Sequence, residues 1–65
     1  MTLEELLKEK NISAFRLSKE SGVPNATISD LKLEKTSIGN MRVENAYKIA
    51  KTLDMTIDDL YNTLK

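Results

Sequence analysis

The sequence contains no cysteine and no histidine. Without cysteine no disulfide supports the core, and without either residue type a Cys/His zinc site and a histidine general base are excluded. Aromatic residues make up only 5% of the chain, which argues against a platform on which single-stranded bases stack. No apolar run exceeds two residues, as at Leu6 and Leu7, so we expect no membrane contact and a cytoplasmic protein. No cofactor is implied.

Net charge is also absent, because 10 Lys and Arg balance 10 Asp and Glu. This balance weakens the usual electrostatic argument for a nucleic-acid binder. Residues 13–35 are the most basic part, with four basic and three acidic side chains. With 65 residues, one proline and two glycines, the chain offers no linker. We therefore expect residues 1–65 to form a single domain.

Helical spacing is the dominant pattern. Thr2 and Glu5 form a capping box, and Leu3, Leu6 and Leu7 then give one apolar face of a helix that ends near Lys10. Further helices are predicted from Ala14 to Ser21, from Pro24 to near Leu33, over 43–53 and over 57–64. Their predicted apolar contacts include Phe15 and Leu17 in the second helix and Val43, Ala46, Tyr47, Ile49, Ala50 and Leu53 in the fourth. Only 35–41 reads as a loop and no window alternates as a strand does, so the predicted fold is all-α with five short helices.

The stretch 15–31 carries the most information. It reads as a helix, a turn at Gly22 and a second helix. A small residue at Ser18 and apolar side chains at Val23, Ile28 and Leu31 suit two helices that meet at a steep angle. This packing is typical of a helix-turn-helix, which projects the amino end of its second helix into a DNA major groove.

Residues 16–31 resemble the Cro and phage-repressor helix-turn-helix family, also called the XRE type. The family pattern Leu-Ala-x-x-Ser-Gly-Val, followed by Thr-Ile-Ser-x-Leu, is matched here by 17–23 and 27–31, with Ser18 in place of Ala. Residues 47–60 are similar to the closing helix pair of the family. The resemblance covers nearly the whole chain and implies a lambda-repressor-like domain. The chain lacks the glycine that the family usually carries after its third helix, since 32–35 reads Lys-Leu-Glu-Lys.

The resemblance also implies a set of DNA contacts. Base edges would be faced by Pro24, Asn25, Ala26 and Asp30. The DNA backbone would be contacted by Ser13, Ala14, Lys19, Thr27, Ser29, Lys32 and Lys35. At Ser13 and Ala14 the attraction would come from the backbone N–H groups and the dipole of the second helix.

Each of these assignments has a simpler alternative. Asn25 could pair with adenine in the major groove, or it could merely help to cap the third helix. Asp30 could accept a hydrogen bond from cytosine N4, or it could pair with a neighbouring lysine or turn away from DNA. Lys32 and Lys35 could be solvated cations that suit the helix dipole.

The carboxyl end offers candidates for a dimer contact. Ile57, Tyr61 and Leu64 exceed what a thin core must bury, so we expect some of them to face a second copy. The alternative is that they close the core of the monomer. Asp54, Asp58 and Asp59 lack the spacing of a calcium loop, and we expect no metal site.

The sequence predicts a transcriptional regulator, a repressor that binds an inverted-repeat operator in double-stranded DNA as a homodimer. No enzyme is expected, because no serine or threonine has a base to activate it. Repression would be controlled by protein level or by a regulatory protein partner. The alternative is a protein-interaction module, an antitoxin-like or adaptor protein, in which DNA binding is secondary; the neutral charge and Asp30 favour that reading.

Overall fold

The computed structural model describes residues 1–64. These residues form α1 (Leu3–Lys10), α2 (Ala14–Ser21), α3 (Asn25–Lys32), a short 3-10 helix η1 (Ile38–Asn40), α4 (Val43–Thr52) and α5 (Ile57–Leu64), with no strand in this part of the chain. The predicted all-α fold of five short helices is confirmed. The bounds differ slightly, since Pro24 is the N-cap of α3 rather than part of its first turn. The predicted loop 35–41 contains η1, in which Ile38 is buried.

Three helices begin at a residue whose side-chain hydroxyl caps the first turn. In the capping box of α1, the Glu5 N–H donates to Thr2 Oγ1 at 3.2 Å and the Thr2 N–H donates to Glu5 Oε1 at 2.9 Å. The backbone hydrogen bond from Thr2 lowers the pKa of Glu5, because it stabilises the ionised carboxylate. Ser13 Oγ accepts from the Arg16 N–H at the start of α2, and Thr56 Oγ1 caps α5 in the same way.

Each of the helices α1 to α4 is followed within two residues by a residue in the left-handed backbone region. Gly22, at the predicted turn, follows α2 with φ +79°. Asn11, Glu34 and Asp54 also have positive φ although they carry side chains. After α3, the Glu34 N–H donates to the Leu31 carbonyl at 3.2 Å and the Lys35 N–H donates to the Asp30 carbonyl at 2.8 Å. This pair of hydrogen bonds is a Schellman motif. It ends α3 although Glu34, and not the glycine that the family usually carries, occupies the left-handed position.

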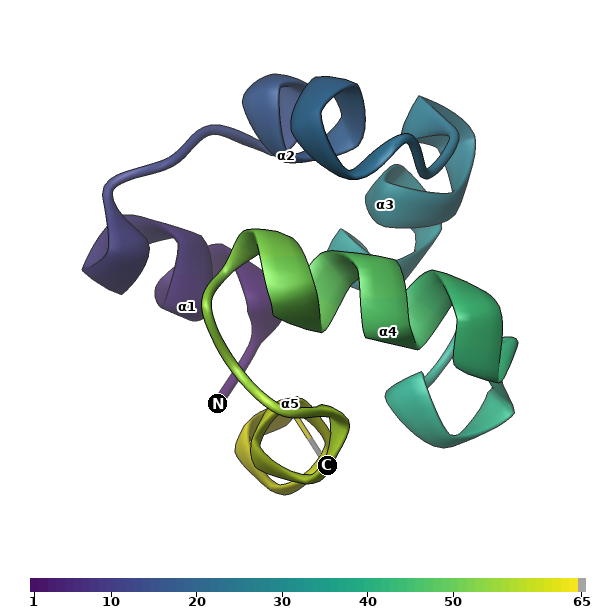
Figure 1. Cartoon of the computed structure of the whole chain (residues 1–65). Helices are drawn as coiled ribbons and strands as arrows, with labels where there is room; N and C mark the ends of the chain where they lie inside the picture. The colour runs from purple at the N-terminus through teal and green to yellow at the C-terminus, as the bar shows by residue number, and fades with distance from the viewer. Residues whose placement is uncertain (65) are drawn as a thin grey trace.

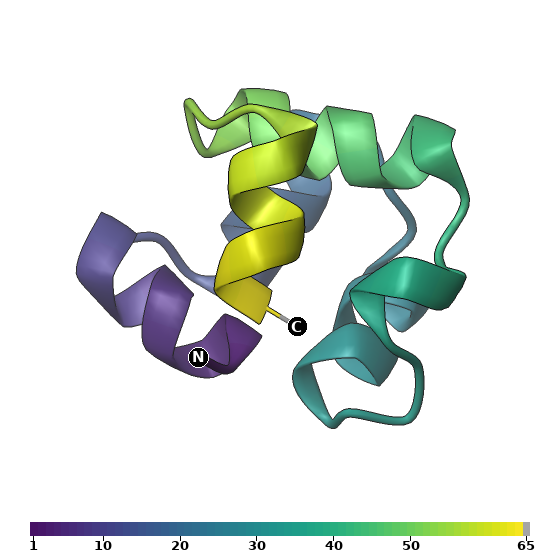
Figure 2. The same ribbon diagram turned by 90° about the horizontal axis from the view of Figure 1, so that it is seen from below.

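α4 crosses the middle of the molecule, with α2 and α3 above it, α5 below it and α1 at the left (Figure 1). It packs against both α2 and α5, and α3 packs against α2 and α1. Figure 2 shows α5 running across α4, with the segment between α3 and α4 at one side. The core between them is aliphatic: Leu3, Leu6, Leu7, Leu17, Val23, Ile28, Leu31, Ile38, Ala46, Ile49, Ala50, Leu53 and Leu60.

Three side chains assigned to the core by spacing are on the surface. Phe15 is 70% exposed, because it lies two residues from the fully buried Leu17, on the opposite side of α2. Val43, the first residue of α4, is 73% exposed. Tyr47 is 52% exposed, with Lys51 Nζ 5.9 Å from its ring centroid. The expectation that these residues belong to the apolar contacts of the core was wrong.

Candidate nucleic-acid interface

The joint between α2 and α3 is held by hydrogen bonds within the turn. Ser18 Oγ donates to the Val23 carbonyl at 2.7 Å, and the Val23 N–H donates to Ser21 Oγ at 3.2 Å. The Val23 side chain is buried, as is Ile28 in the following helix. These contacts fix the direction in which α3 leaves the turn, which is what a helix-turn-helix requires of its second helix.

One side of α3 is buried and the other is open. Ile28 and Leu31 face the core, whereas the predicted base-contact residues all lie on exposed surface: Pro24, Asn25, Ala26 and Asp30. Ser29 is exposed beside them and Thr27 is half-buried. The buried pair anchors α3 and leaves its amino half accessible.

The amide of Asn25 is available for an external partner. No side chain caps α3, and Asn25 makes no side-chain hydrogen bond to any residue that the structure describes. The alternative in which Asn25 helps to cap the helix is therefore wrong. Its carbonyl oxygen and amino group are the pair of atoms that can bond adenine N6 and N7.

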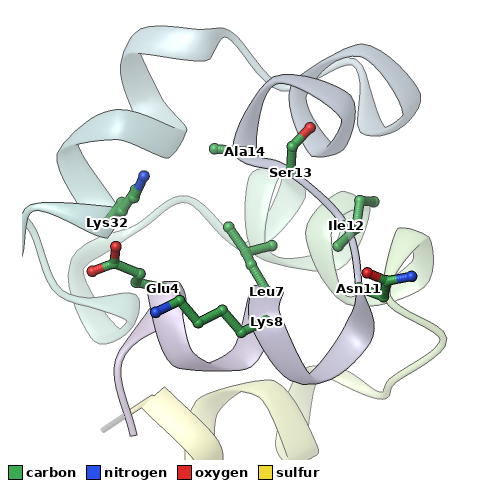
Figure 3. Close-up of a pocket in the computed structure, with 8 residues that line it drawn as sticks. All are labelled: Glu4, Leu7, Lys8, Asn11, Ile12, Ser13, Ala14 and Lys32. Carbon is green, nitrogen blue, oxygen red and sulfur yellow. The ribbon is translucent and has the colours of Figure 1, made fainter.

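A surface pocket brings together three of the predicted backbone contacts. Ser13 and Ala14 from the start of α2 and Lys32 from the end of α3 line it, together with residues of α1 that include Glu4 and Lys8 (Figure 3). The Arg16 and Leu17 N–H groups bond to Ser13 Oγ and to the Ser13 carbonyl. The first two N–H groups of α2 have no partner within the helix and can serve an anion.

Lys19 and Lys35 lie apart from this pocket. Lys19 lines a different hollow on α2 with Phe15, Arg16 and Glu20. There the hydrogen bond from Arg16 to Glu20 raises the pKa of the guanidinium, which stays charged. Lys35 lines a third hollow together with Thr2, the N-cap of α1, and Leu64 of α5. The structure thus groups Lys32, but neither Lys19 nor Lys35, with the start of α2.

The structure also shows two polar residues beside α3 that sequence reasoning missed. Arg42 and Asn45 line a hollow with Thr27 and Asp30. The only signal in the sequence was an arginine between Lys35 and Lys48 at the end of the loop. The position of Arg42 relative to α3 depends on the path of residues 33–42, and no local sequence pattern specifies that path.

The three dimer candidates of α5 have different environments. Leu64 is partly buried and packs against the core, so it has a role within the monomer. Ile57 is half-buried. Tyr61 is 44% exposed, and its ring lies 3.5 Å from the position that a Cβ on Gly39 would take. The side of α5 that carries Tyr61 is the accessible one.

The arrangement of α2, turn and α3 is that of a helix-turn-helix domain. A family model described as the Cro/C1-type HTH DNA-binding domain matches residues 2–65. The chain belongs to this family, which confirms the predicted resemblance and identifies a DNA-binding domain. Comparisons with curated proteins and with solved structures gave no match. Within residues 1–64, no helix is long and apolar enough to cross a membrane, and no cluster of possible metal ligands occurs.

Proposed function

We propose that the protein is a sequence-specific transcriptional regulator, a repressor that binds an inverted-repeat operator as a homodimer. The observation that carries this proposal is the open amino half of α3, held in place by buried Ile28 and Leu31. Pro24, Asn25, Ala26 and Asp30 would enter the major groove. Such a regulator would act in the cytoplasm, with a regulatory protein partner as one means of control.

DNA phosphates would be met at the pocket between α2 and α3. There the amino end of α2 and Lys32 offer N–H donors and a positive charge side by side. Thr27, Ser29, Lys19 and Lys35 would add contacts along the backbone. Because the net charge is zero, non-specific attraction to DNA is weak, and tight binding needs two copies and good base contacts.

Selection of bound duplexes from a random-sequence DNA library tests the proposal. We expect enrichment of an inverted repeat whose half-sites are about one turn of DNA apart, roughly 34–36 Å. Asn25→Ala should then relax the preference at one base pair of each half-site and cost about 1–3 kcal/mol per contact. Asn62→Ala is the matched control, because Asn62 is exposed on α5, away from α3. A library without enrichment overturns the proposal.

A protein-interaction module is the second candidate. The exposed Phe15, Val43 and Tyr47 favour it, because large apolar side chains on a small surface suit a protein partner. In this case the same selection enriches no duplex. If the Phe15→Ser and Tyr47→Ser variants instead bind DNA with full specificity, these two side chains have no part in DNA binding.

A further inference from the structure

A hollow beside α3 contains two opposite charges from different elements. Asp30 and Thr27 line it from α3, whereas Arg42 and Asn45 line it from the start of α4. Asp30 and Arg42 are both exposed, so the hollow is open on the side of α3 that the proposed function assigns to DNA.

Each of these charges is at the unfavourable end of its helix. Asp30 belongs to the last turn of α3, where the helix dipole is negative. Arg42 is the N-cap of α4, where the dipole is positive, and its carbonyl accepts from the Ala46 N–H at 3.0 Å. Each side chain would therefore gain from a partner of opposite charge.

Neither side chain has such a partner within the described residues. The ion pairs of this part of the chain are Arg16 with Glu20 and Lys48 with Glu44. The carboxylate of Asp30 therefore faces the DNA side unneutralised. On a DNA-binding face it would be repelled by phosphates, unless a cation accompanies it.

We propose that Arg42 is a positioning residue for DNA recognition, and that it holds the Asp30 carboxylate against a base-edge amino group. On DNA, the Arg42 guanidinium would move across the shared hollow to the Asp30 carboxylate. Asp30 could then accept a hydrogen bond from cytosine N4 without a net negative charge at the interface. Arg42 supplies the charge and Asp30 supplies the base preference. This inference rests on the proposed function, since it assigns a role to the same DNA-binding face.

A double-mutant cycle on DNA tests the coupling. The four proteins are the parent, Asp30→Asn, Arg42→Ala and the double variant. The probes are the duplex that the parent selects from a random library and its single base-pair variants. We expect Asp30→Asn and Arg42→Ala to reduce the preference at the same base pair, each by about tenfold or more. The double variant should show no further loss of that preference. Lys51→Ala removes a cation elsewhere on α4 and is the matched charge control.

The outcomes separate this inference from the proposed function. If Arg42→Ala weakens binding to every duplex by the same factor, Arg42 does not position Asp30. An unchanged preference in Asp30→Asn overturns the inference as well, while an enriched operator still supports the regulator. If no duplex is enriched, both fail together. The helical signal of each variant checks that the exposed substitutions leave the fold intact.

Discussion

The Ser18 hydroxyl donates a hydrogen bond to the Val23 carbonyl across a distance of 2.7 Å. The bond spans the turn at Gly22 and joins α2 to Val23, whose side chain is buried between α2 and α3. Alanine, which the family often has at this position, could not make it. The bond also removes the cost of placing a hydroxyl at a partly buried helix crossing, since that hydroxyl has its partner.

Ser18→Ala should therefore destabilise the domain. It leaves the Val23 carbonyl without this donor, at a cost of about 1 kcal/mol. Ser29→Ala, at an exposed position of α3, is the control, because it measures only the gain in helix propensity from serine to alanine. The two variants are compared by urea unfolding. Equal free energies of unfolding would show that the bond contributes nothing.

Substitution of Gly22 should be costly for backbone reasons only. A Cβ at Gly22 would meet no atom within 4 Å, yet φ is +79°. Gly22→Ala should lose about 1–2 kcal/mol, and Gly22→Val should lose more because its side chain is branched at Cβ. Gly39→Ala should be nearly neutral, since its new Cβ would lie 3.5 Å from Tyr61, an ordinary contact. A Gly22→Val variant that melts with the parent contradicts this.

Glu34→Gly should stabilise the protein. Glu34 holds φ +61° at the end of α3, a conformation that costs a side-chain-bearing residue energy. Glycine removes that strain and loses some in chain entropy, so the expected net gain is below about 1 kcal/mol. Glu34→Gln keeps the side chain and removes the charge, and it should show no gain. The measurement is the midpoint of thermal unfolding. A lower midpoint for Glu34→Gly than for the parent would show that the backbone at Glu34 is not strained.

Tyr61→Asp tests the dimer contact. Sedimentation should show weaker self-association, while the helical signal of the monomer persists, because Tyr61 is exposed. Leu64→Asp is a harsher change, since Leu64 packs against the core and its loss also lowers stability. Thr63→Asp on the neighbouring position adds the same charge as a comparison. A parent chain that stays monomeric at high concentration and protects one half-site defeats the dimer assignment.

Local chemistry made the helix starts and the joint predictable. Thr2, Ser13 and Gly22 act through their own side chains or backbone within a few residues, so their roles can be identified in the sequence. The exposure of Tyr47 could not be predicted, because the spacing of apolar residues identifies the buried side of a helix but not how wide that buried side is. Arg42 was missed for a related reason: its neighbour Asp30 comes from another helix.

The α-helices of this domain have eight or ten residues each. Helices shorter than about 12–15 residues barely persist alone in water. The surface on α3 therefore exists only while the aliphatic core is intact, and no part of it survives as a separate peptide. Loss of the folded core therefore also removes the proposed recognition surface. A bound operator would hold the entire chain in its native form, and a core substitution would silence DNA binding without touching a contact residue.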